Sequence, residues 1–130
     1  MTIAKRDASE QRTAMSPQVF QILLSLLDQD LHGYALIQDI RRRTGGEISL
    51  TASTLYAATK RLLGADLIEE VELPTPQAQH DARRRYYRIT SRGRAAAREE
   101  ARRLERVLAM AREKRLLGTL RAEAQPKGSR

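Results

Sequence analysis

The segment that follows Ser16 constrains the fold most, because its apolar residues leave it almost no side to expose to water. Ser16-Pro17 has the pattern of a helix start, with serine as the N-cap and proline at the first helical position. Two adjacent stripes at helical spacing follow, made of Phe20, Leu23, Leu24 and Leu27 and of Val19, Ile22 and Leu26. A helix that is apolar on most of its circumference has to be buried. The sequence therefore predicts a helical domain built around this element.

Length and composition limit the classes of protein that the chain can belong to. With 130 residues it should form one domain with a modest core, so some apolar surface can require a second copy. The absence of cysteine excludes disulfides and thiolate metal sites. No apolar run approaches the roughly 20 residues of a membrane span, and the N-terminus lacks the apolar core of a signal peptide. We therefore expect a cytoplasmic protein that does not span a membrane.

The positive charge of the chain is concentrated in its last third. The net charge is +8, but residues 1–82 hold 8 Lys/Arg and 11 Asp/Glu, a net of −3, whereas residues 83–130 hold 16 and 5, a net of +11. A localised positive field indicates a polyanionic partner, which could be DNA, RNA or an anionic membrane surface. The alternative at this point is an arginine-rich surface that only keeps the protein in solution.

A second helix is expected after a short turn at residues 28–33. Leu36, Ile37 and Ile40 stand at helical spacing, and Gly45-Gly46 gives the end of the helix. Three arginines, residues 41–43, occupy its last turn, where the helix dipole favours cations. We prefer this structural explanation of the arginines to a binding role.

The third predicted helix, within "LTASTLYAATKRLLGADLI", has an unusual polar face. Thr51 is its predicted N-cap. The apolar stripe consists of Leu55, Ala58, Leu62 and Leu63. The middle of the helix also contains Thr54, Tyr56, Thr59, Lys60 and Arg61. A helix that packs on one side and presents hydroxyls and a cation on the other is suited to binding a ligand.

Two short strands and a long helix complete the predicted fold. "LIEEVEL" and "RRYYRIT" are rich in strand-forming residues and partly alternate, so they predict an antiparallel hairpin around the loop "PTPQAQHDAR". In the last helix, apolar residues step by four and three as in a coiled-coil seam, which predicts pairing with a second copy. The expected dimerisation residues are Phe20, Ala97, Ala101, Leu104, Leu108 and Ala111.

The order of these elements suits a winged helix-turn-helix. Two helices joined by a short glycine-containing connection precede a hairpin wing, and the connection between its two strands is basic. In such a module the second of the two helices enters the DNA major groove. The predicted DNA-binding residues are Tyr34, Ser53, Thr54, Tyr56, Lys60, Arg83, Arg84 and Arg85. The fold class is thus mainly α with a small β-hairpin, a winged helix-turn-helix plus a long C-terminal dimerisation helix.

Three stretches resemble the PadR family of winged-helix transcriptional regulators. "ILLSLLDQDLHGYALIQDI" is similar to the first two helices of that family, "LTASTLYAATKRLLGADLIEE" to its recognition helix with Thr54-Leu55-Tyr56, and "RRRYYRITSRGR" to its second wing strand. The resemblance implies a homodimer on an inverted-repeat operator, commonly a repressor that a small molecule or another signal releases. Ala52-Ser53 replaces a family Pro-Gly pair, which leaves the start of the recognition helix open. Asp66 replaces a family glycine, and aspartate tolerates the left-handed backbone well.

Catalysis has no support in the sequence. It contains no glycine-rich phosphate loop, no nucleophile beside a base and no ligand cluster, so we expect neither an enzyme nor a cofactor. His32 and His80 are far apart and predict no metal site. The alternatives to a DNA-binding regulator are an RNA-binding or ribosome-associated winged-helix protein and a protein-interaction adaptor.

The expected domain organisation has four parts. They are a flexible arm over residues 1–15, the DNA-binding domain over 16–93, the dimerisation helix over 94–121 and a disordered tail over 122–130.

Overall fold

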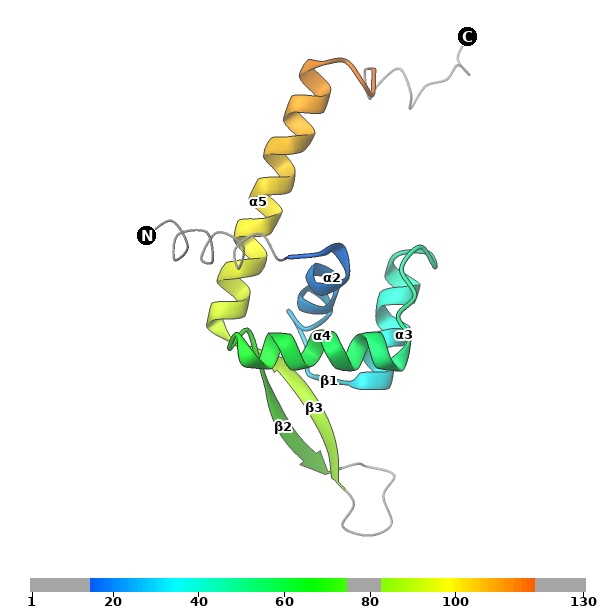
Figure 1. The fold of residues 1–130 in the computed structure, drawn as a ribbon, viewed down its shortest axis with the longest axis vertical. Coiled ribbons are helices and arrows are strands. Elements are labelled where there is room, and N and C mark those ends of the chain that lie inside the picture. Colours follow the sequence, from blue (N-terminus) through cyan, green and yellow to red (C-terminus); the bar gives the residue numbers. More distant parts are fainter. Residues whose placement is uncertain (1–14, 75–82, 119–130) are drawn as a thin grey trace. The chain divides into compact units, whose positions relative to one another are not determined.

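The computed structural model describes residues 15–74 and 83–118, shown in colour in Figure 1. The elements are α2 (Pro17–Ser25), β1 (Leu31–His32), α3 (Gly33–Arg43), α4 (Ala52–Gly64), β2 (Ile68–Pro74), β3 (Arg83–Ile89) and α5 (Ser91–Glu113). The structure is mostly helical with a small antiparallel sheet, as the sequence predicts. Nearly all of the expected N-terminal arm and of the hairpin loop, including His80, and the whole expected tail lie outside the described residues.

Helix α2 begins as the sequence predicts and ends earlier than its apolar stripe. The Oγ atom of Ser16 accepts a hydrogen bond of 3.1 Å from the backbone N–H of Val19, and Pro17 occupies the first turn. The helix ends at Ser25, although apolar residues continue to Leu27. Ile22 is fully buried. Val19, Leu23 and Leu26 are also buried, but Phe20, Leu24 and Leu27 are only half-buried. The helix is thus part of the core, and one of its two apolar stripes is less covered than the sequence required.

The sheet contains a third strand in the segment that we expected to be a turn. Leu31 and His32 form β1 and pair with Tyr87 and Tyr86 of β3. The strand order is β1-β3-β2, and both pairings are antiparallel. Two residues are too few to show a strand's alternation of apolar and polar positions, so β1 could not be predicted from local sequence.

The β2–β3 hairpin runs from a buried base to an outer end. Ile68 pairs with Ile89 at the base, where both side chains are buried, and Pro74 pairs with Arg83 at the other end. Figure 1 shows the hairpin extending away from α4. Arg83, which we expected in the loop, is therefore part of β3.

The contacts divide the chain into two units, residues 1–97 and residues 98–130, which are described separately. The first unit holds the core, where Ile22, Leu23, Leu36 and Ile40 are almost completely buried. Ala97 belongs to this core and is 5% exposed. An expected residue of the dimer seam is thus covered within its own chain.

Helix α5 begins before the expected residue 94 and ends before residue 121. The hydroxyl of Thr90 accepts a hydrogen bond of 3.0 Å from the N–H of Gly93, which caps the first turn. A Cβ atom at Gly93 would lie 2.1 Å from the carbonyl oxygen of Leu67, so this turn admits only glycine. The helix ends at Glu113, and Arg115 adopts the left-handed conformation with φ 61°.

Candidate nucleic-acid interface

The start of α4 is fixed by the predicted N-cap. The Oγ1 atom of Thr51 accepts a hydrogen bond of 3.1 Å from the N–H of Thr54, and the helix begins at Ala52. The Ala52-Ser53 pair therefore forms the first turn of the helix. After the helix, Asp66 has φ 64°, so aspartate does occupy a left-handed position here.

The inner face of α4 attaches the helix to α3. Leu55, Ala58 and Leu62 are buried, as the apolar stripe predicts. A Cβ atom at Gly33 would lie 3.3 Å from Cδ2 of Leu55, a separation tighter than nearly all real contacts of this kind. The first residue of α3 thus approaches α4 closely, which brings the two helix starts together.

Thr59 does not belong to the outer face, contrary to the reading of the sequence. Its side chain is 1% exposed, and its hydroxyl donates a hydrogen bond of 3.0 Å to the carbonyl oxygen of Tyr56. Thr59 follows Leu55 by four residues, which places both on the same side of the helix. Its polar group is satisfied by the helix backbone, and its methyl group is available to pack.

The outer face of α4 is exposed and has few internal contacts. Ser53, Thr54, Tyr56 and Lys60 are all exposed, and the tyrosine keeps 64% of its surface in water. The Nζ atom of Lys60 lies 5.8 Å from the centroid of the Tyr56 ring, within the range of a cation–π interaction. This face offers hydroxyl donors, an aromatic ring and a cation on a helix that is held from behind.

Tyr34 is exposed at the start of α3. It keeps 65% of its surface in water and follows Gly33, the residue that approaches α4. His32 caps α3, because its Nδ1 atom accepts a hydrogen bond of 3.3 Å from the N–H of Ala35. Its ring also meets Tyr86 edge-on at 5.4 Å. The cap was missed because histidine is a rare residue at this position and because His32 lay within the turn predicted over residues 28–33.

The strand arginines of the wing are partly paired within the protein. Arg85 is exposed, and its Nε atom lies 3.8 Å from Oε2 of Glu70. Arg88 forms a hydrogen-bonded ion pair with Asp30, with Nη2 at 2.8 Å from Oδ2, and this carboxylate raises the pKa of the arginine. Arg83 and Arg84 also lie in β3. The wing is therefore basic on β3, with a carboxylate near Arg85.

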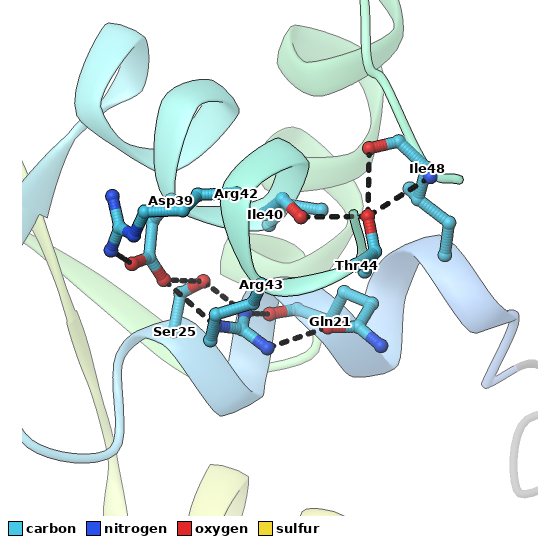
Figure 2. Close-up of polar contacts among 8 residues, drawn as sticks. All are labelled: Gln21, Ser25, Asp39, Ile40, Arg42, Arg43, Thr44 and Ile48. Carbon is cyan, nitrogen blue, oxygen red and sulfur yellow. Dashed lines mark hydrogen bonds and ion pairs between the residues drawn. The ribbon is translucent and has the colours of Figure 1, made fainter. Parts of the chain in front are cut away.

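A polar network missed in the sequence joins α2 to α3 (Figure 2). The hydroxyl of Ser25 donates to Oδ2 of Asp39 over 2.7 Å, and Nε of Arg43 donates to the same oxygen over 2.9 Å. Arg42 bonds the other carboxylate oxygen, and Arg43 reaches Oε1 of Gln21 at 2.8 Å. Burial alone would raise the pKa of Asp39, but these hydrogen bonds and the two guanidinium charges together lower it. Arg42 and Arg43 thus have partners within the chain.

Thr44 shapes the connection from α3 toward α4. Its hydroxyl donates to the carbonyl oxygen of Ile40 at 2.8 Å and accepts from the N–H of Ile48 at 3.0 Å (Figure 2). Gly45 and Gly46 lie inside this turn with positive φ, as expected for the end of the helix. The turn between α3 and α4 is therefore stabilised by hydrogen bonds among residues close in sequence.

The second unit exposes a row of apolar side chains along α5. Leu104 and Leu108 are each 42% exposed, and Val107 and Met110 lie near them in sequence and are more exposed. Ala101 is exposed and Ala111 is half-buried. Phe20, the other expected dimerisation residue, is half-buried in the first unit and packs against the core.

Residues 15–74 and 83–118 contain no group of three or more His, Cys, Asp or Glu that could hold a metal ion. Among the helices described, none is long and apolar enough to cross a membrane.

Comparison with known proteins gives a family for more than half of the chain. Residues 22–99 match the model of the transcriptional regulator PadR-like family. An uncharacterized protein designated X from Lysinibacillus sphaericus is 36% identical over 74 residues, which cover 57% of this chain. The present chain spans 65% of the length of that relative.

Solved structures share the fold. A transcriptional regulator from Clostridium thermocellum superposes with a TM-score of 0.64 at 26% identity, over 74% of this chain and 87% of the other. PadR of Bacillus subtilis, solved in complex with operator DNA, superposes with a TM-score of 0.57 at 22% identity, over 67% of this chain and 48% of that one.

Proposed function

Because the chain belongs to the PadR-like family of transcriptional regulators, we propose that it regulates transcription by binding specific sites in double-stranded DNA. The observation that carries this proposal is the outer face of α4, where Tyr56 and Lys60 are exposed on a helix buried along its other side. The family is one of regulators rather than enzymes, in line with the expectation from the sequence.

In this proposal α4 lies in the major groove. Ser53, Thr54, Tyr56 and Lys60 contact bases or phosphates there, because hydroxyls and an ammonium group match the acceptors of both. Tyr34 contacts the backbone at the edge of the groove, since Gly33 holds the start of α3 against α4. Arg83, Arg84 and Arg85 follow the neighbouring phosphates along the wing. The operator complex of Bacillus subtilis PadR supports this use of the fold.

We propose further that two copies pair through the apolar row of α5. Leu104 and Leu108 together expose an apolar strip that a short chain cannot easily cover alone. Ala101 and Ala111 continue the same seam. A two-fold dimer of this kind binds an inverted repeat, because the symmetry of the site mirrors that of the protein.

The sign and control of regulation complete the proposal. We propose a repressor that dissociates when an effector, such as a small molecule, binds, as the resemblance to the family implies. Since its target is chromosomal DNA, the same proposal places the protein in the cytoplasm.

Selection of binding sites from random duplex DNA tests the DNA role. We expect a short inverted repeat to be enriched, with an affinity that falls as salt rises. Duplex RNA of matched length serves as the competitor. Enrichment of no sequence, together with equal affinity for RNA and DNA, would favour the RNA-binding alternative and contradict the proposal.

Sedimentation of Leu108→Asp tests the dimer. A carboxylate in the proposed seam would be desolvated without a partner, so we expect a shift toward monomer at micromolar concentration and a large loss of operator affinity. Ala109→Asp, one residue along the helix and outside the seam, adds the same charge and should remain dimeric. A Leu108→Asp protein that stays dimeric with full affinity would remove this row from the interface.

A further inference from the structure

Three hydroxyl groups meet at the N-terminus of α4. The hydroxyl of Thr51 donates a hydrogen bond of 2.9 Å to Oγ1 of Thr54, while its oxygen accepts the backbone N–H of the same residue at 3.1 Å. The hydroxyl of Ser53 is 3.4 Å from Oγ1 of Thr51, a weak contact in which Ser53 is the donor if the proton of Thr51 goes to Thr54. All three side chains are exposed. The cap residue is thus bonded to both the backbone and the side chain of Thr54.

These hydrogen bonds determine whether the Thr54 hydroxyl can still donate or accept. A hydroxyl has one proton to donate and two lone pairs to accept. Thr51 spends its proton on Oγ1 of Thr54, so the proton of Thr54 has to be directed away from Thr51. The described part of the chain gives that proton no acceptor. The Thr54 hydroxyl is therefore prepared as a donor toward solvent, on the exposed face of α4.

We propose that Thr51 is a positioning residue that presents the Thr54 hydroxyl to DNA as a hydrogen-bond donor, an inference that rests on the proposed DNA-binding function. The matching atom on DNA is an acceptor. It is either a phosphate oxygen or a base-edge acceptor of the major groove, such as N7 or O6 of guanine or O4 of thymine. The amino groups of cytosine and adenine are themselves donors, so they cannot accept this hydrogen bond and are disfavoured as partners of Thr54.

The energetic basis is preorganisation. A free hydroxyl rotates and bonds to water, so binding has to select one of its orientations. Here the bond from Thr51 removes the orientation in which Thr54 donates backward to its own helix cap. Hydroxyl groups at helix starts commonly donate hydrogen bonds to nearby groups of the same helix. Such a local bond would compete with a hydrogen bond to a ligand.

Two uncharged substitutions of the cap residue, Thr51→Asn and Thr51→Ser, distinguish the positioning of the Thr54 hydroxyl from helix capping alone. Asparagine and serine cap helices at least as well as threonine. In Thr51→Asn, the oxygen that takes the place of the threonine hydroxyl is Oδ1, which accepts the N–H of Thr54 but has no proton, whereas the donor protons of asparagine are on Nδ2. We therefore expect the Thr54 hydroxyl to turn inward and donate to Oδ1. Thr51→Ser keeps a hydroxyl at the same position. Thr54→Val removes the hydroxyl at nearly constant shape.

The measurement is the affinity of each full-length variant for the selected duplex. We expect Thr54→Val to weaken binding about two- to tenfold, the value of one neutral hydrogen bond. Thr51→Asn should cause a similar loss, Thr51→Ser should bind nearly as the parent does, and Thr51→Asn should cost nothing more in a Thr54→Val background. Urea unfolding of each variant verifies that it is folded at the assay temperature, and Ser53→Ala measures the third hydroxyl separately.

The pattern across DNA sequences identifies the acceptor. A loss that is equal for all duplexes assigns it to phosphate, and a loss confined to one base pair assigns it to a base edge. Thr51→Asn binding as tightly as the parent, or weakening the Thr54→Val protein by the same factor, would overturn the inference while leaving the proposed function intact. A parent protein without affinity for any duplex would overturn both.

Discussion

At the crossing of α2 and α3, charged and polar side chains bond one another, whereas on the outer face of α4 similar side chains face water. Asp39 is buried and receives hydrogen bonds from Ser25, Arg42 and Arg43 (Figure 2). On α4, the ammonium group of Lys60 lies over the ring of the exposed Tyr56, and residues 15–74 and 83–118 give it no ion pair. Both regions belong to the first unit and are built on neighbouring helices.

The difference separates polar residues that hold the fold from polar residues available to a ligand. A buried carboxylate is costly unless it is paired and hydrogen-bonded, so the partners of Asp39 are explained by the fold. An exposed tyrosine and lysine on a well-packed helix contribute little to the stability of the chain alone. Arginines and lysines of equal formal charge thus play different roles, and this division between structural and ligand-binding charges can be tested by substitution.

The largest effect is expected from removing the carboxylate of the network. Asp39→Ala leaves Ser25 and Arg43 without their shared partner, and hydrogen bonds to charged groups are worth about 1.5–3 kcal/mol. We expect the free energy of unfolding to fall by about 3 kcal/mol in urea denaturation. Asp28→Ala, which removes an exposed carboxylate from the turn after α2, should change it by less than about 0.5 kcal/mol. Equal effects of the two variants would mean that the network is not structural.

The second effect concerns DNA affinity. Lys60→Ala should weaken binding by about 1–3 kcal/mol at one base pair if the ammonium reads guanine. If it contacts phosphate, the loss should be similar for all duplexes and the salt slope should fall by about 0.9. Arg42→Ala removes a charge that is paired with Asp39 and should leave the salt slope unchanged. Binding titrations at several salt concentrations distinguish these outcomes, and an equal change in both variants would contradict the division.

The third effect is the change in the free energy of unfolding as the pH is lowered. Because the folded protein lowers the pKa of Asp39, the unfolded chain takes up its proton first as the pH falls. The ionised carboxylate therefore stabilises the fold above its ordinary pKa of 3.8, and this contribution is lost as the pH falls through the lower folded value. The difference in unfolding free energy between the parent and Asp39→Asn should be constant near neutral pH and shrink below about pH 4. A difference that stays constant down to pH 2 would contradict the pairing.

The parts of the fold that the sequence predicted depend on local signals. Ser16 and Thr51 start helices, and the glycines after α3 end one, through contacts within one helical turn of their own position. Their residue types were therefore sufficient to predict these helix ends. The apolar stripe of α4 was read correctly because helical spacing places its members on one side. The exposed positions of Tyr56 and Lys60 followed from the same periodicity.

The parts that were missed depend on partners distant in sequence. β1 exists because Leu31 and His32 meet β3 more than fifty residues later, and no local pattern indicates this pairing. Ser25 and Asp39 are 14 residues apart and belong to different helices. Thr59 was misread because its hydroxyl suggested solvent, although its spacing from Leu55 already indicated the buried side.

The smallest effect concerns the ring beside Lys60 and tests whether the α4 face is organised before DNA binds. A cation–π interaction at an exposed site is worth about 0.5–1 kcal/mol. Tyr56→Leu removes the π face, so the ammonium of Lys60 becomes less restricted and affinity for the selected duplex should fall by about that amount. Tyr56→Phe keeps the ring and removes only the hydroxyl, so it measures any direct hydrogen bond from the phenol to DNA.

A double-mutant cycle with Lys60→Ala isolates the interaction between the two side chains. If Tyr56 acts through Lys60, Tyr56→Leu should cost clearly less in the Lys60→Ala background than in the parent, as measured by fluorescence anisotropy with labelled duplex. Additive losses would instead mean that the ring contacts DNA independently of the lysine. In that case Tyr56 and Lys60 would be separate contacts on the α4 face, in contrast to the mutually bonded side chains of the α2–α3 network.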